Sequence, residues 1–165
     1  MFYLDLFKAL EEHEVSYLLI GGLAMNLHGI PRMTMDVDIV LILENKNLSA
    51  FIAAAQSLGL QPEIPVMLED LKNPSARKNW VTDKNLIALP LKNNQPDSPT
   101  VDIILKHPLD IDTAMQQATI KNIDGISVRL ASINDMITLK SFSGRKQDLS
   151  DLEHLKRIAK NEQPE

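Results

Sequence analysis

Residues 20–41, IGGLAMNLHGIPRMTMDVDIVL, hold the pattern that decides the fold expected for this chain of 165 residues. The apolar run of residues 17–20 ends in a pair of glycines, which predicts a buried strand entering a tight turn. Residues 23–27 are expected to form a short helix. Residues 36–43 alternate and then become wholly apolar, as a central strand with one hydrated end does.

The segments outside this stretch predict a mixed central sheet flanked by helices, an α/β (α+β) architecture in a single domain of residues 1–165. Residues 61–99 hold most of the prolines and are expected to form loops and a mobile flap. Strands are expected at residues 86–91 and 101–105, with a hairpin at residues 122–126 whose type I′ turn lies on Asp124 and Gly125. Helices are expected at residues 2–14, 49–58, 109–118, 132–143 and 148–160.

Composition and charge restrict the class of protein. The net charge of −5 argues against a protein that holds nucleic acid mainly by neutralising phosphates. Residues 129–160 carry seven basic and four acidic residues, which favours a solvated helix face over a docking site for a polyanion. Cysteine is absent, which excludes disulfides and thiolate chemistry. The N-terminal segment resembles no signal peptide and no apolar run could cross a bilayer, so we expect a cytoplasmic protein without a membrane partner.

Asp36 and Asp38 are the first candidates for chemistry. Residues two apart on a strand face the same side, so the two carboxylates project together. Adjacent anions at the end of an apolar strand are costly unless a cation lies between them, and Mg²⁺ prefers such ligands. Asp102 opens a second apolar strand. If the two strands are neighbours, three carboxylates converge, which is enough to hold two metal ions for an in-line phosphoryl displacement.

Other acids and apolar residues are interpreted as structural. An isolated Asp-x-Asp is more often a pair of solvated turn residues, and Asp110 and Asp112 are assigned to a helix N-terminus. Ile104 is expected in the core. Three methionines near the acidic pair are expected to pack against the sheet: Met25, Met33 and Met35. The histidines outside the first helix have no metal-ligand spacing and are expected at surface or capping positions: His28, His107 and His154.

Gly21 and Gly22 add a second chemical feature. They end a strand and precede a short helix, where backbone N–H groups can cradle phosphates. Only residues without bulky side chains let a triphosphate approach the backbone so closely. The succession of strand, Gly-Gly, short helix, Asp-x-Asp strand and a later Asp strand is much more specific than any one of its parts.

This succession resembles the nucleotidyltransferase-fold (DNA polymerase beta-like) superfamily, in which Gly-Gly or Gly-Ser precedes an Asp-x-Asp strand. The thirteen-residue spacer between Gly22 and Asp36 suits that pattern, and Asp102 lies where the third carboxylate belongs. His28-Gly29, Arg32 and Thr34 are similar to minimal stand-alone bacterial members, including AbiEii-type nucleotidyltransferases of toxin–antitoxin pairs. A later helix with Lys140, followed by Arg145 and Asp148, resembles one in the same relatives.

The resemblance implies a role for each matching residue. Asp36, Asp38 and Asp102 would bind Mg²⁺ or Mn²⁺, and Asp102 would also polarise the acceptor hydroxyl or act as its base. The nucleotide would contact Gly21, Gly22, Arg32 and Thr34. Lys140 would neutralise charge on the transferred phosphate or the leaving pyrophosphate, the alternative being an exposed helical lysine. Arg32 would either reach the phosphates or fix its loop, and Arg145 with Asp148 is interpreted as a structural pair positioning Lys140.

The function expected from these residues is a metal-dependent transfer of NMP from an NTP to a hydroxyl. The acceptor stays open among an RNA end such as tRNA, a protein and a small molecule, as does a cognate toxin or antitoxin partner. The alternative is a catalytically silent module of the same fold that senses nucleotide or binds a partner. All three carboxylates and both glycines are present, which favours the enzyme.

Overall fold

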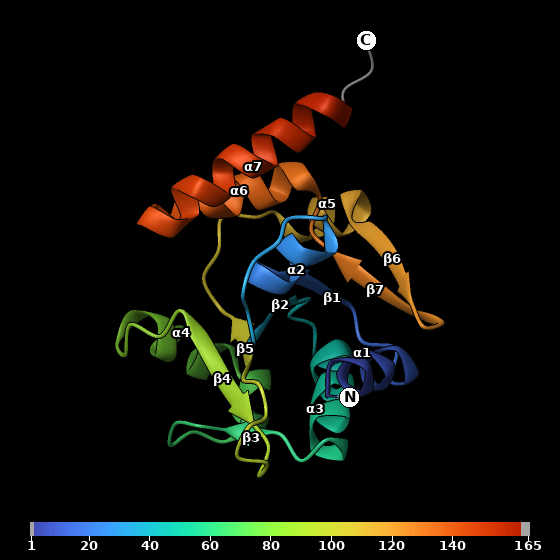
Figure 1. Ribbon diagram of the computed structural model, residues 1–165. Coiled ribbons are helices and arrows are strands. Elements are labelled where there is room, and N and C mark those ends of the chain that lie inside the picture. The colour runs from blue at the N-terminus through green and yellow to red at the C-terminus, as the bar shows by residue number, and fades with distance from the viewer. Residues whose placement is uncertain (1, 163–165) are drawn as a thin grey trace.

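The computed structural model describes residues 2–162 of the chain, and within them the strands form one mixed sheet of seven (Figure 1). The sheet order is β3-β4-β5-β2-β1-β7-β6. The strands are β1 (Tyr17–Ile20), β2 (Val37–Leu41), β3 (Gln61–Pro62), β4 (Ala88–Lys92), β5 (Val101–Ile104), β6 (Thr119–Ile123) and β7 (Ile126–Leu130). The expected mixed α/β sheet flanked by helices is therefore confirmed.

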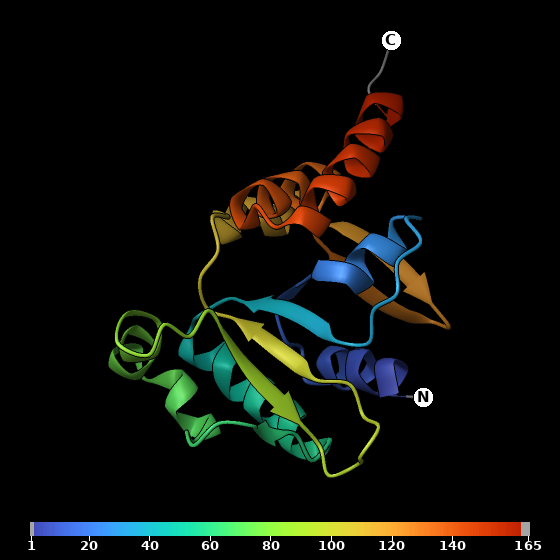
Figure 2. The same cartoon turned by 60° about the vertical axis from the view of Figure 1, so that its left-hand side comes forward.

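Helices cover both faces of this sheet (Figure 2). One face carries α1 and α3, which contact each other, and the other carries α2, α6 and α7. The helical segments are α1 (Phe2–Glu12), α2 (Gly21–Leu27), α3 (Asn45–Ser57), the 3₁₀ segment η1 (Leu68–Lys72), α4 (Pro74–Thr82), α5 (Ile111–Gln117), α6 (Ile133–Ser143) and α7 (Lys146–Glu162). No helix in this part of the chain is long and apolar enough to cross a membrane.

The three central strands pair as the apolar runs require. β2 pairs antiparallel with β1 and parallel with β5, so it is covered on both edges. All four residues of β1 are buried, as are Val37, Ile39, Val40 and Leu41 of β2. The turn in the β6–β7 hairpin has positive φ at both Asp124 and Gly125, which confirms the type I′ turn.

The segment from residue 61 to residue 99 is more regular than expected. Instead of a flap it contains two short strands, η1 and α4, and it buries Leu71 and Trp80 in the core. Asn73 caps α4 by accepting hydrogen bonds from the backbone N–H groups of Ser75 and Ala76, and Pro74 occupies the first helical turn. The Asn-Pro-Ser sequence is a helix start that could have been recognised from the sequence.

Two expectations about packing were wrong. Met25 is fully buried, but Met33 and Met35 are 99% and 62% exposed, because both lie in the loop that joins α2 to β2 and not over the sheet. Ile104 is half-buried and faces the same side of β5 as Asp102. Ile103 is the β5 residue that enters the core, with no exposed surface.

Replacing Ile103 by Ala should lower the free energy of unfolding by about 2–5 kcal/mol, because it leaves a cavity in a close-packed core. Ile104→Ala is the matched control on the same strand and should cost less than half as much, since Ile104 keeps contact with water. Urea titration followed by circular dichroism measures both values. Equal losses at the two positions would contradict the assigned orientation of β5.

Candidate active site

Asp38 and Asp102 are direct neighbours in the sheet. Asp38 on β2 is the register partner of Asp102 on the parallel strand β5, and Ile20 at the end of β1 is the partner of Asp38 on its other side. The two carboxyl groups lie close enough for the charge of Asp38 to raise the pKa of Asp102. Because parallel pairing sets side chains of partner residues on the same face, the strands themselves impose this contact.

Asp36 completes the acidic group from the loop just before β2. One of its carboxylate oxygens, Oδ1, accepts a hydrogen bond from the backbone N–H of Thr100 at 3.3 Å. The carbonyl of Met35 accepts a hydrogen bond of 2.6 Å from the Tyr3 hydroxyl, which anchors the same loop to α1. The charge of Asp36 raises the pKa of both Asp38 and Asp102, so the three carboxyl groups form one electrostatic cluster.

Burial and mutual repulsion perturb the titration of the pair. Burial raises the pKa of Asp38, and the charge of Asp36 adds to this effect. Burial, followed by the neighbouring charge of Asp38, raises the pKa of Asp102 to about 7. Ionising both carboxyl groups is therefore disfavoured unless positive charge is close to them.

The chemistry of this cluster suits a divalent cation. Mg²⁺ and Mn²⁺ prefer carboxylate oxygens as ligands. The raised pKa values of Asp38 and Asp102 indicate that this cluster has too little positive charge close to it. Among the described residues no group of three or more His, Asp or Glu side chains already surrounds a common point as metal ligands do. Asp36, Asp38 and Asp102 are thus near one another without being arranged as a closed site.

Gly21 and Gly22 bring α2 against the acids. A Cβ atom on Gly21, whose φ is +77°, would lie 2.1 Å from Oδ2 of Asp38. A Cβ on Gly22 would lie 2.8 Å from the Thr34 side chain. Packing against Asp38 and Thr34 thus requires glycine here, whether or not a phosphate also approaches the turn.

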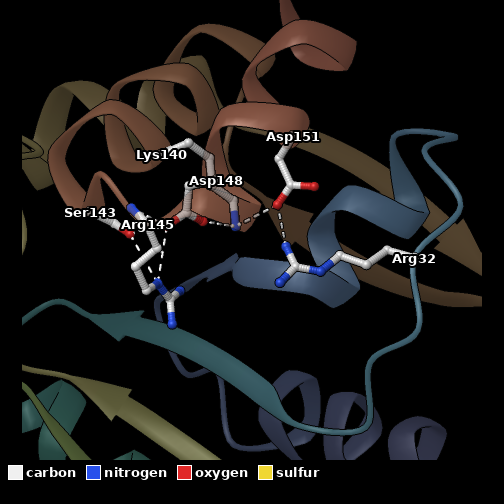
Figure 3. Close-up of polar contacts among 6 residues, drawn as sticks. All are labelled: Arg32, Lys140, Ser143, Arg145, Asp148 and Asp151. Carbon is white, nitrogen blue, oxygen red and sulfur yellow. Dashed lines mark hydrogen bonds and ion pairs between the residues drawn. The ribbon is translucent and has the colours of Figure 1, made fainter.

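Lys140 lies on α6, across the cleft from the acids (Figure 3). Its side chain is buried, which contradicts the alternative of an exposed helical lysine. Its Nζ donates to Oδ1 of Asp148 at 3.1 Å and lies 3.2 Å from Oδ2 of Asp151. Asp151 also pairs with Nη1 of Arg32, which ties the loop before β2 to α7. Arg32 therefore does fix its loop, while its buried Nε has no partner among the described residues.

Arg145 and Asp148 form the expected structural pair beside Lys140 (Figure 3). Burial alone would raise the pKa of Asp148, but hydrogen bonds from Ser143, Lys140 and Arg145 hold that pKa at about 2. The Arg145 side chain is 75% exposed, and its charge together with that of Lys140 lowers the pKa of Asp38. Arg145 therefore interacts electrostatically with Asp38 and also forms an ion pair with Asp148.

One cleft of about 660 Å³ is lined by the three acids, the two glycines, Lys140, Arg145 and Asp148, whereas Asp151 lies behind its lining. Every residue singled out from the sequence as a metal, nucleotide or catalytic candidate lines it: Gly21, Gly22, Arg32, Thr34, Asp36, Asp38, Asp102 and Lys140. The carboxylates lie on the sheet side, and Lys140 and Arg145 belong to the α6–α7 side. The cleft thus has an acidic wall and a basic wall.

Solved structures resemble this chain at low sequence identity. No protein-family model and no curated protein sequence matches it. The lincosamide antibiotic adenylyltransferase LnuA, solved with lincomycin, aligns over 94% of this chain and 95% of its own at 16% identity and a TM-score of 0.60. The chain has the nucleotidyltransferase fold.

Two further structures share this nucleotidyltransferase fold. An antigenic nucleotidyltransferase-like protein from Paracoccidioides brasiliensis aligns over 93% of this chain and 72% of its own, at 19% identity and a TM-score of 0.58. ANT(2″)-Ia, in complex with adenylyl-2″-tobramycin, aligns over 93% of this chain and 84% of its own, at 12% identity and a TM-score of 0.52. At these identities the likeness establishes the nucleotidyltransferase fold alone.

Sequence reasoning missed two residues near the site. Asp151 pairs with both Arg32 and Lys140, and its spacing of three from Asp148 on one helix face could have indicated this. His107 lines the cleft instead of the outer surface, because it lies three residues after the end of the strand that carries Asp102. Nothing in its local sequence indicates that position.

Asp102→Asn should stabilise the protein at neutral pH in metal-free buffer. The raised pKa of Asp102 means that its ionised form is disfavoured in the folded state, so wild type loses stability as pH rises from about 4 to about 7. The amide does not ionise, so the advantage of the variant should grow across that window and stay constant above it. Urea titrations at several pH values measure this difference.

Asp97→Asn is the matched control, because it makes the same change at an exposed position in the turn that follows β4. It should follow wild type at every pH. A stability difference between Asp102→Asn and wild type that is as large at pH 4 as at pH 8 would contradict the assigned cause.

Proposed function

We propose that this chain transfers NMP from an NTP to an acceptor hydroxyl, using Mg²⁺ or Mn²⁺ held by Asp36, Asp38 and Asp102. The observation that carries the proposal is the cleft in which this acidic cluster opposes Lys140 and Arg145. A triphosphate with its metal needs both kinds of group at once, since carboxylates bind the cation and basic side chains bind the phosphate oxygens. A bound divalent cation would supply charge neutralisation and orient the α-phosphate.

The other steps of the proposed reaction are assigned to individual residues of the chain. The acceptor oxygen attacks the α-phosphorus, the bond from that phosphorus to the bridging oxygen of the β-phosphate breaks, and pyrophosphate leaves. Asp102 takes the proton from the acceptor hydroxyl or polarises it. The turn at Gly21 and Gly22, which lines the cleft together with Thr34, would receive the β- and γ-phosphates.

The basic wall would receive the charge that develops on the leaving group. Lys140 has three N–H donors, and the contacts with Asp148 and Asp151 occupy two of them, so a third remains for a phosphate oxygen. Arg145 is well exposed and lines the cleft, so its guanidinium is a further donor. These cations are held in place by buried acids before any ligand binds, which lowers the cost of reorganisation.

The silent nucleotide-sensing module is the second candidate, and one observation favours it. The three acids do not form a ready-made metal site among the described residues. The narrower AbiEii-type assignment, with a cognate toxin or antitoxin, adds a partner protein to the same chemistry. The experiments below separate transfer from binding, and comparing the growth of cells that express wild type or Asp38→Asn tests the toxin assignment.

Asp38→Asn should abolish nucleotidyl transfer while the protein stays folded. The amide keeps the shape of the side chain but removes a charge that positions the metal and phosphates, so the rate should fall by roughly a hundredfold or more. The assay follows α-³²P-labelled NTPs into the RNA, protein and small-molecule fractions of a cell extract. Asp112→Asn, which changes an exposed acid, should label as wild type does. Equal labelling by wild type and Asp38→Asn would refute the site.

Mg²⁺ or Mn²⁺ together with an NTP should raise the thermal unfolding temperature of wild type. A ligand at a hundred times its Kd stabilises a protein by about 2.7 kcal/mol. The metal alone should give a smaller rise, since it relieves repulsion among the carboxylates, and Asp38→Asn should lose most of both effects. No shift with any of the four NTPs would contradict nucleotide binding. A shift without labelling would favour the sensor.

A further inference from the structure

The cleft continues past the carboxylates in the direction away from the glycine turn. Asp102 and Ile104 share one face of β5, and Ala88 on β4 is the register partner of Ile104. Gly21 lies at the other end, where β1 finishes beside the start of β2. The acids therefore lie between the glycine turn and a second end of the cleft.

That second end is mostly apolar. Ile87, which precedes the Ala88 partner of Ile104, lines this end, and Phe142 of α6 lines the same cleft; they are 65% and 56% exposed, an unusual exposure for side chains of their size. Pro108, which follows β5, adds to this lining, and Leu139 of α6 is a further apolar residue of the cleft. The polar side chains that follow β5 here are Lys106 and His107.

His107 is fixed as an uncharged hydrogen-bond donor. Its Nδ1 accepts a hydrogen bond of 3.2 Å from the backbone N–H of Leu109. A backbone N–H can only donate, so Nδ1 carries no proton and the neutral ring bears its proton on Nε2. Burial lowers the pKa of His107, which keeps the ring neutral. No partner for Nε2 is present among the described residues, and the ring lines the cleft.

The geometry of in-line displacement determines whether the nucleotide or the acceptor binds at this end of the cleft. The attacking oxygen must approach the α-phosphorus from the side opposite the leaving pyrophosphate. If the pyrophosphate rests at the glycine turn, the acceptor comes from the end where Ile104 and His107 lie. This step rests on the proposed transfer reaction and on the placement of the pyrophosphate at the glycine turn.

We propose that the acceptor is a small molecule with an apolar face, and that His107 donates a hydrogen bond from Nε2 to an oxygen or nitrogen beside its reacting hydroxyl. The apolar lining favours such a molecule over an RNA end, whose phosphates would need several cations where this end offers Lys106. The concave site, lined by a few apolar side chains and one placed donor, is the form that small-molecule sites take.

The first test reads the histidine ring directly and does not depend on transfer. Ring ¹⁵N shifts of the labelled protein at neutral pH distinguish the two neutral tautomers, and the His107→Phe variant identifies the signal. The proton is expected on Nε2. A proton on Nδ1 would overturn the proposal, since the cleft-facing nitrogen would then be an acceptor.

The second test follows the label from α-³²P-labelled NTPs in a cell extract. Product is expected among small molecules that a reversed-phase column retains. Label confined to RNA or protein would overturn this inference and leave the proposed function standing. No label in any fraction would refute the proposed function itself, and this inference with it.

The third test uses the acceptor purified from that labelled fraction. His107→Phe keeps a ring but lacks the donor, so the KM for the acceptor should rise roughly 3- to 10-fold while the Kd for NTP stays unchanged. His107→Gln restores an N–H donor and should recover most of the loss. His154→Phe, at an exposed position of α7, is the matched control and should behave as wild type. Weaker NTP binding by His107→Phe with an unchanged acceptor KM would place the nucleotide at this end and overturn the proposal.

Discussion

The pairing of Asp38 with Asp102 is the constraint on which the rest of the structure depends. Parallel strands set the two carboxyl groups side by side, and partial burial removes the water that would otherwise solvate them. Such a pair is tolerated only where positive charge, as a proton or a cation, is available. Because Asp38 occupies the space beside the end of β1, the following residue must be Gly21, which has no side chain to collide with it. The turn, the short helix and the opening of the cleft all follow from that contact.

The basic wall depends on a second set of buried charges. Lys140 would be costly to bury alone, but Asp148 and Asp151 neutralise it, and Asp151 extends the network to Arg32 in the loop before β2. The same contacts hold α7 and that loop at a fixed place relative to α6 (Figure 3). Removing one partner from such a network leaves a buried charge uncompensated, so the residues of the network depend on one another. The cations that face the acids are in this way positioned by structure and not by ligand.

The sequence by itself determined the central strands and the identity of the chemical groups. Apolar runs bounded by glycines or acids specify β1, β2 and β5, because burial on both faces of a strand leaves a continuous apolar signal. The two-residue spacing of Asp36 and Asp38 and the turn at Asp124 and Gly125 are local patterns that need no partner. In residues 61–99, Asn73 and Pro74 are a local helix start of the same kind, whereas the burial of Leu71 and Trp80 depends on packing.

Tertiary structure alone decided which groups meet. Register between β2 and β5 brings Asp102 beside Asp38, although 64 positions separate them in the chain. Helix packing buries Lys140 against Asp151, and the exit from β5 turns His107 into the cleft. Tertiary structure also leaves Met33 and Met35 exposed in a loop, although their apolar side chains predict burial. Local sequence encodes backbone preference and polarity, whereas contacts between distant segments depend on how the whole apolar surface is buried at once, and that is settled only when the sheet and its helices pack together.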